Sequence, residues 1–214
     1  MGILQDYKIV VKDGDASQIF ESLLGSSTFL DLSYESPSDY VKQYWNLYEE
    51  HPLNSDIKKN RNNTNGKIFE YILATLLVRE GLVPYFLSAK IAFVPNVVYD
   101  ITLFSGEIGP ISLSAKTSLR ERYKQADLES IALKYVHRKA RAYLINNKKS
   151  ESENVREKIK KGHVIGLDDI IFAQSSDFDK LIESLKKFKF CHPGAIEIIN
   201  STQMVTGEKA SNAC

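Results

Sequence analysis

The apolar residues of this chain change their spacing along the sequence, and that change limits the folds it can adopt. Before residue 82 they recur at helical spacing, as in Ile19, Phe20 and Leu23. Between residues 82 and 115 they form short runs rich in Val, Ile, Phe and Tyr, separated by Pro-Asn, Ser-Gly and Gly-Pro turns. Helical spacing then returns, followed by a strand, a helix and a last strand. This order predicts an α/β or α+β fold in which helices flank a mixed central sheet.

The pattern also gives approximate bounds for the elements. Helices are expected at residues 16–24, 67–79, 123–145 and 177–188, with a further one that Ser38 or Asp39 caps and Pro52 ends. Strands are expected at 91–94, 97–104, 111–115, within 163–173 and at 195–199, with a hinge at 57–66 and a polar linker at 146–162. The predicted organisation is an N-terminal helical region (1–56), a core (57–205) and a flexible tail (206–214).

Composition excludes several classes of protein. At 214 residues and 43% hydrophobic, the chain can bury a core without disulfides or a structural metal. Its two cysteines, Cys191 and Cys214, do not form a disulfide scaffold or a zinc motif. No apolar run is long enough to span a membrane, and the first residues lack the pattern of a signal peptide. A cytoplasmic protein without a membrane partner is therefore expected.

The net charge of +1 conceals an uneven distribution. Residues 116–149 hold ten Lys or Arg against three acids, a local charge of +7, and the rest of the chain carries −6. Such a segment is typical of a surface that faces a polyanion, and a solvated amphipathic helix is the alternative.

Candidate catalytic residues lie at the ends of two predicted strands. Asp100 ends one strand and Lys116 ends the next, where Ser114 and Lys116 share a face. The turn between the strands can bring Asp100 beside Lys116. Glu70, in an apolar helix, and Glu129, in the helix after Lys116, are two further acids that could point inward. Carboxylates beside a lysine form an oxygen-rich pocket suited to Mg²⁺.

These residues resemble the signature of the PD-(D/E)xK nuclease superfamily, with Ser114-Ala115-Lys116 in place of the usual acid-x-Lys. That variant is similar to the branch of type II restriction endonucleases that reads CC and GG steps, the group of PspGI and EcoRII. In that branch a Glu in the following helix replaces the missing acid, and Glu129 fits this position. The branch also carries an Arg-Glu-Arg triplet just after the lysine, as at 120–122 here. The resemblance covers about residues 60–145, and Tyr99 stands where a Pro is usual.

The resemblance implies an Mg²⁺-dependent, site-specific endonuclease that cuts double-stranded DNA at CC/GG steps and leaves 5′ phosphates. Asp100 and Glu129 would hold the metal, Lys116 would position or help deprotonate the attacking water, and Glu70 would support the site. Because the target is two-fold symmetric, a homodimer is expected. The N-terminal region would serve in DNA contact or dimerisation, and a cognate DNA methyltransferase would be a genetic partner.

Base reading is assigned to the charged segment after Lys116. Arginine bonds guanine bidentately in the major groove and glutamate accepts from cytosine, so Arg120, Glu121 and Arg122 can read adjacent G·C pairs, with Lys124 beside them. The alternative is a charged turn at a helix start.

Other roles remain open for the acids and for the protein as a whole. Glu129 could pair with a surface lysine, and Glu70 could be exposed on a polar stripe of its helix together with Lys67. A DNA-binding module without catalysis, or another nuclease of the superfamily that acts in repair or in a mobile element, are the alternative functions.

Overall fold

The computed structural model describes residues 2–51, 61–94, 96–194, 199–201 and 203–207. Its centre is a sheet in the order β5-β4-β3-β2-β1-β6, with β7 also paired to β1. The pairs β1/β2 and β2/β3 are antiparallel, whereas β4 is parallel to both β3 and β5. The strands are β1 (Tyr85–Ile91), β2 (Tyr99–Ser105), β3 (Gly109–Lys116), β4 (Arg141–Asn146), β5 (Asp169–Phe172), β6 (Ile199–Asn200) and β7 (Gln203–Val205). The predicted mixed sheet flanked by helices is confirmed.

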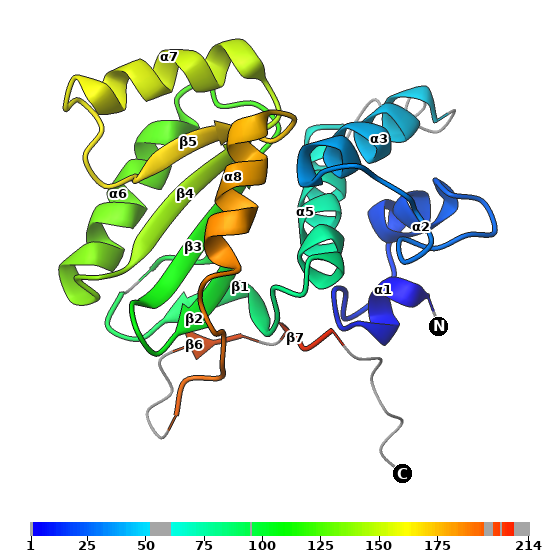
Figure 1. Cartoon of the computed structure of the whole chain (residues 1–214), viewed down its shortest axis with the longest axis horizontal. Coiled ribbons are helices and arrows are strands. Elements are labelled where there is room, and N and C mark those ends of the chain that lie inside the picture. The colour runs from blue at the N-terminus through cyan, green and yellow to red at the C-terminus, as the bar shows by residue number, and fades with distance from the viewer. Residues whose placement is uncertain (1, 52–60, 95, 195–198, 202, 208–214) are drawn as a thin grey trace.

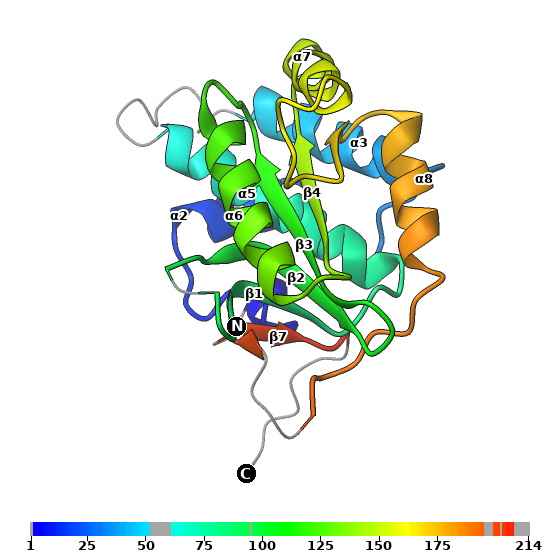
Figure 2. The same ribbon diagram turned by 90° about the vertical axis from the view of Figure 1, so that its left-hand side faces the viewer.

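Helices cover both faces of this sheet (Figure 1). On one face, α5 and α8 share a core with the sheet, and the three N-terminal helices join the same core beyond α5. On the other face, α6 and α7 lie over β4 and β5 (Figure 2). The described helices are α1 (Ile3–Asp6), α2 (Asp15–Ser22), α3 (Pro37–Glu50), α5 (Arg61–Arg79), α6 (Arg122–Val136), α7 (Lys149–Lys160) and α8 (Ser176–Leu185).

The predicted helix at 123–145 is wrong in its second half. The helix ends at Val136, and residues 141–146 form β4, a strand in the middle of the sheet. Ala142, Leu144 and Ile145 are fully buried because β4 has neighbours on both edges and helices on both faces. A strand buried on both faces shows no polar alternation, so its sequence is equally compatible with a buried helix.

Three other predicted segments also differ. The strand expected at 91–94 lies earlier, at 85–91, where only Ser88 and Lys90 are exposed. Residues 61–66, expected within a hinge, begin α5, and residues 149–160 of the expected linker form α7. That helix is almost wholly polar and buries only Ser152 and Val155. Its ion pairs at helical spacing, such as Glu157 to Lys160, stabilise it where apolar contacts are few.

The predicted cap of α3 differs from the observed one, and parts of three predicted segments are not described. Ser36, rather than Ser38 or Asp39, caps α3, because its hydroxyl accepts from the Asp39 amide at 3.3 Å. Residues 195–198 of the last predicted strand, residues 57–60 of the hinge and residues 208–214 of the tail lie outside the described residues.

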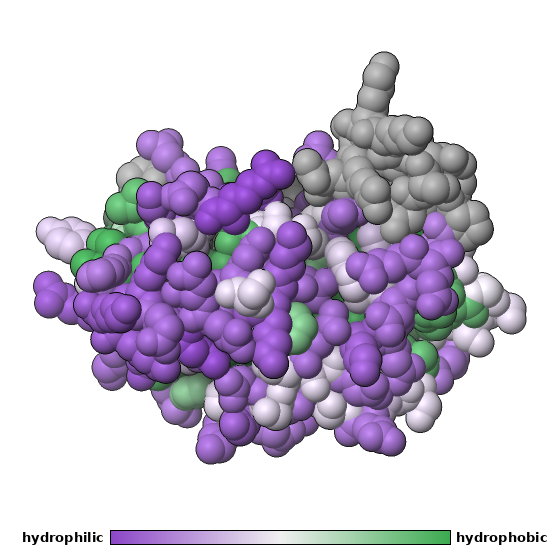
Figure 3. Space-filling view, turned by 90° about the horizontal axis from the view of Figure 1, so that it is seen from above, coloured by the Kyte–Doolittle hydropathy of each residue, from purple (hydrophilic) through white to green (hydrophobic). Residues whose placement is uncertain are grey.

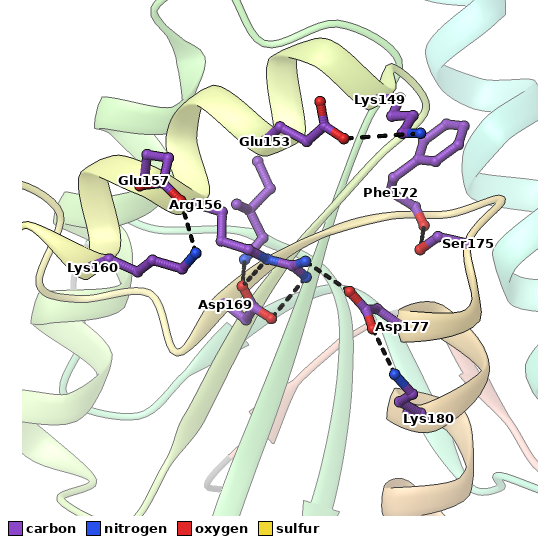
Figure 4. A network of polar contacts seen from close by, with 11 residues as sticks. Lys149, Glu153, Arg156, Glu157, Lys160, Asp169, Phe172, Ser175, Asp177 and Lys180 are labelled. Carbon is purple, nitrogen blue, oxygen red and sulfur yellow. Dashed lines mark hydrogen bonds and ion pairs between the residues drawn. The ribbon is translucent and has the colours of Figure 1, made fainter.

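Polar contacts fix the edge strand β5 between α7 and α8 (Figure 4). The Arg156 guanidinium of α7 donates to both carboxylate oxygens of Asp169 at 3.0 Å and to Asp177 at 2.7 Å. Lys180 makes a second ion pair with Asp177 at 3.0 Å. One arginine therefore links the edge strand to a helix on each face of the sheet.

A membrane-spanning helix is not found among the described residues, because none of their helices combines the length and hydropathy that a membrane crossing requires.

Candidate active site

Asp100 and Lys116 meet where β2 begins and β3 ends, so the prediction that Asp100 ends its strand is wrong. The two strands are antiparallel, with Ile101 opposite Leu113, so the first residues of β2 lie beside the last residues of β3. The Lys116 ammonium donates to Oδ2 of Asp100 at 2.6 Å, and the Ala115 amide donates to the same oxygen at 2.8 Å. Both side chains are about a quarter exposed. The expected contact is confirmed, and it leaves Asp100 partly accessible where these two central strands end.

Glu70, in α5, lies close enough to Asp100 and Lys116 to interact with both charges. Its carboxylate accepts from Lys67, one helical turn earlier, at 2.7 Å. Burial raises the pKa of Glu70; the Lys67 ammonium opposes this rise and the Asp100 charge adds to it. Burial pulls the pKa of Lys67 down, but the Glu70 carboxylate outweighs it and leaves the pKa raised. The Glu70 side chain is 25% exposed and that of Lys67 is 51% exposed, so Glu70 is only partly accessible where it bonds Lys67.

A cavity of about 210 Å³ joins these acids to parts of the chain that the sequence pattern did not connect. Glu70 and Asp100 line it together with Lys67, and Lys12, Ser88 and Gln203 complete its polar lining. Gln203 comes from β7 and donates to the Ile9 carbonyl at 2.6 Å, which holds the N-terminal segment at the rim. Lys67 could have been found from its spacing to Glu70. No sequence pattern marked Lys12 or Gln203 as site residues, because only the tertiary fold brings both chain ends to this cavity.

The hydrogen bonds of Glu129 are made with Gln125 and Tyr99 rather than with Asp100 or Lys116. It is in the second turn of α6, and its carboxylate accepts from Gln125 at 2.7 Å. Its backbone carbonyl accepts from the Tyr99 hydroxyl at 3.0 Å, which ties α6 to the residue before Asp100. Among the described residues, no three His, Cys, Asp or Glu side chains gather closely enough to hold a metal ion. The structure thus brings Asp100, Lys116 and Glu70 together and leaves Glu129 bonded within its own helix.

The Arg-Glu-Arg triplet lies at the start of α6, exposed to solvent. Arg120, Glu121 and Arg122 are all exposed, and Arg120 has a left-handed backbone (φ 44°). Glu121 makes an ion pair with Lys124 and forms no side-chain cap on the helix. The Lys124 ammonium holds the pKa of Glu121 below its usual value. The buried Leu119 just before the triplet donates its amide to Glu151 at 2.5 Å, which anchors the loop while its charged side chains face outward.

Comparisons with known proteins support the fold. No family model matches the chain, and no curated protein matches it. A solved structure, the complex of the restriction endonuclease PspGI with substrate DNA, superposes with a TM-score of 0.56 at 17% identity. The match covers 88% of this chain and 87% of that one. The chain therefore has a restriction-endonuclease-like fold over nearly its whole length.

Proposed function

We propose that this protein is a site-specific endonuclease that hydrolyses phosphodiester bonds of double-stranded DNA, as type II restriction enzymes do. The observation that carries the proposal is the contact of Asp100 with Lys116 between the neighbouring ends of β2 and β3, near Glu70. A carboxylate held against a lysine, with a second carboxylate across an accessible cavity, is a set of groups suited to phosphodiester hydrolysis. The PspGI complex, a DNA-bound enzyme of the same fold, supports DNA as the substrate.

The donor set at this cavity fits Mg²⁺. Asp100 and Glu70 supply carboxylate oxygens, which Mg²⁺ prefers, and their charges are close enough for Asp100 to raise the pKa of Glu70. These two residues would hold the ion, and a bound Mg²⁺ would supply charge stabilisation at the phosphate oxygens. Glu129 is the alternative second ligand, as the resemblance implies, provided that its carboxylate turns away from Gln125.

Lys116 is placed to act on the attacking water. Its ammonium already contacts Asp100 at 2.6 Å, so its flexible stem can direct it to a water held beside that carboxylate. There it would orient the attacking water or take part in its deprotonation. In-line attack would leave a 5′ phosphate on the product.

The exposed triplet would read the DNA sequence. Arg120 and Arg122 are free to reach guanine edges and Glu121 to accept from cytosine, which favours a short site with CC/GG steps. Lys124 would contact the backbone once it leaves Glu121, because an ion pair between exposed side chains is weak. A homodimer would place one active site on each strand of a symmetric target, and a DNA methyltransferase of the same specificity would protect host DNA.

The test is plasmid cleavage by the native protein with Mg²⁺ and with EDTA. We expect discrete fragments with 5′ phosphates only when Mg²⁺ is present. Sequencing the fragment ends gives the recognition site and the stagger of the cut. Absence of cleavage with every divalent metal tested, together with specific DNA binding, would exclude the nuclease.

One observation favours a second candidate, a DNA-binding module without catalysis. Among the described residues no three-acid cluster is assembled, and Asp100 is neutralised by Lys116. In that case a duplex with CC/GG steps would bind with the same affinity in Mg²⁺ and in EDTA and would remain intact.

A further inference from the structure

Two lysines besides Lys116 lie at the cavity that Glu70 and Asp100 line. They are Lys12, in the segment after α1, and Lys67, in the second turn of α5. Exposed charged side chains are common on this molecule, whose surface seen from above is mainly hydrophilic (Figure 3), so exposure alone marks no site. Lys12 and Lys67 differ from the other described lysines because they line one cavity with both candidate carboxylates.

The Lys67 ammonium bonds a carboxylate that would hold the metal. It donates to Oε2 of Glu70 at 2.7 Å, and half of the Lys67 side chain is exposed. Burial lowers the pKa of Lys67, but the Glu70 carboxylate raises it by more, and the Asp100 charge adds to the rise. Lys67 therefore interacts with both acids of the cavity, and its flexible stem allows the ammonium to turn to another anion.

Buried neighbours fix the backbone from which Lys12 extends. Ile9 and Val10 are buried, and their amides donate to the Leu4 carbonyl at 2.8 Å and 3.3 Å. The Ile9 carbonyl in turn accepts from the Gln203 side chain at 2.6 Å. Lys12 itself is exposed. It therefore presents a charged side chain to the cavity from a segment that is anchored on both sides.

In the absence of DNA, a lysine occupies each acid of the cavity. Lys116 bonds Asp100 at 2.6 Å, and Lys67 bonds Glu70 at 2.7 Å. A divalent cation on these carboxylates would compete with both ammonium groups, because Mg²⁺ takes the same oxygens. A displaced ammonium needs another anion, and a DNA phosphate is the anion that lysine side chains contact in protein–DNA complexes. The cavity is therefore suited to a phosphate and a metal ion together.

On the basis of the proposed function, we infer that Lys12 and Lys67 form a phosphate-binding pair for the DNA strand at this cavity, and that Lys67 holds Glu70 until the phosphate arrives. Lys12 contacts the phosphate from its anchored segment. Lys67 moves from the Glu70 carboxylate to a phosphate oxygen, which leaves Glu70 available to the metal. Metal and DNA then strengthen each other's binding, because each favours the state in which Lys67 has left Glu70.

An ion pair that only stabilises the helix is the alternative role for Lys67. Such pairs form between residues three apart on any exposed helix. Lys160 and Glu157 of α7 make one, with the same spacing and the same distance of 2.7 Å, and neither residue lines the cavity. Lys160→Met is therefore the matched control, because it removes a contact of the same kind away from both acids.

The first test measures how DNA affinity falls with salt. A labelled duplex with CC/GG steps is titrated by fluorescence anisotropy in Ca²⁺, which also takes carboxylate oxygens, and electrophoresis verifies that the duplex stays intact. Each lost phosphate contact should reduce the slope of log K against log salt concentration by about 1. We expect this reduction in Lys12→Met and in Lys67→Met, the native slope in Lys160→Met, and recovery in Lys67→Arg, which keeps the charge. A native slope in either Lys12→Met or Lys67→Met would overturn the pair.

The second test measures metal binding without DNA and separates the two lysines. Mn²⁺ suits the same oxygen ligands, and electron paramagnetic resonance measures the free ion. Lys67→Met should bind Mn²⁺ about three- to tenfold more tightly than the native chain, because no ammonium then competes for Glu70. Lys12→Met, whose exposed charge is screened by salt, should stay within about twofold of the native affinity. Equal or weaker Mn²⁺ binding by Lys67→Met would overturn the hold of Lys67 on Glu70.

Circular dichroism verifies that every variant is folded. Lys67→Gln removes the charge but keeps a polar side chain, so it replaces Lys67→Met if the methionine variant does not fold. The same slope and Mn²⁺ affinity are expected of it.

These measurements also separate the phosphate-binding pair from the proposed function. A chain that shows both lysine effects but never cleaves DNA in Mg²⁺ refutes the nuclease and leaves the pair. A chain that cleaves DNA while both lysine variants keep the native slope refutes the pair and leaves the nuclease. A native chain that does not bind the duplex at all would overturn both.

Discussion

Replacing Lys116 with methionine tests the candidate active site most directly. The substitution keeps the length of the side chain but removes the ammonium that contacts Asp100 at 2.6 Å. If Lys116 orients or deprotonates the attacking water, the rate of cleavage should fall about 10²- to 10⁴-fold, the range typical of a lost acid-base group. DNA binding should change little, because the triplet that reads the bases remains intact.

Loss of stability can be separated from loss of chemistry. The ion pair is partly buried, with side chains 26% and 21% exposed. The free energy of unfolding lost on its removal should therefore lie between the values for an exposed and a buried pair, at about 1 to 2 kcal/mol. For a chain of this size that corresponds to a fall in Tm of about 2 to 8 °C. The variant therefore stays folded at 25 °C, where the cleavage rate is measured.

Lys186→Met is the matched control. Lys186 also pairs with carboxylates, Glu80 at 2.8 Å and Glu183 at 2.7 Å, and it follows α8, outside the cavity that Glu70 and Asp100 line. It should lose similar stability and keep the native cleavage rate. The assay is single-turnover cleavage of a short duplex in Mg²⁺, with melting followed by circular dichroism. A Lys116→Met enzyme that cuts within threefold of the native rate would refute the assignment of Lys116.

Further predictions concern the second acid, base reading and the edge strand. Glu70→Gln should weaken Mg²⁺ activation at least tenfold and Glu129→Gln much less; the reverse order in an Mg²⁺ titration would restore Glu129 as the ligand. Arg120→Ala should cost about 1 to 3 kcal/mol of binding to the cognate site and relax its specificity; an unchanged site preference contradicts base reading. A hydrogen bond from Arg156 lowers the pKa of Asp177, so this contact stabilises the fold fully above the unfolded pKa of about 4 and is lost as the pH falls through the lower folded value. Urea unfolding of Arg156→Met between pH 3 and 6 should show a smaller loss of stability on acidification than the native chain, and equal losses would contradict it.

The contact of Asp100 with Lys116 was predictable because it depends on local geometry. Two short strands joined by a tight turn pair with their neighbours, so the start of one lies beside the end of the other. Glu70 was predictable only as a polar residue in an apolar helix, since its distance from Asp100 depends on how α5 crosses the sheet. Lys12 and Gln203 were not predictable, because more than 80 residues separate each of them from Asp100.

The strand β4 and the helix α7 show two other limits of the sequence pattern. In β4, burial on both faces removes the alternation that identifies a strand. In α7, only two residues are buried, so its sequence resembles that of a solvated linker. Both elements depend on their neighbours for stability, and a single sequence does not contain that information.

The orientation of α6 differs from what its hydrophobic spacing alone indicates. Leu128, Ile131 and Tyr135 form the more hydrophobic stripe of this helix, and periodicity places such a stripe toward the core. The sheet instead receives Tyr123, Ala126 and Leu133, with the small Ala126 allowing a close approach. The helix therefore carries two apolar sides, one more than its own core requires. Hydrophobic periodicity therefore identifies α6 as a helix but does not determine which of its two apolar sides faces the sheet.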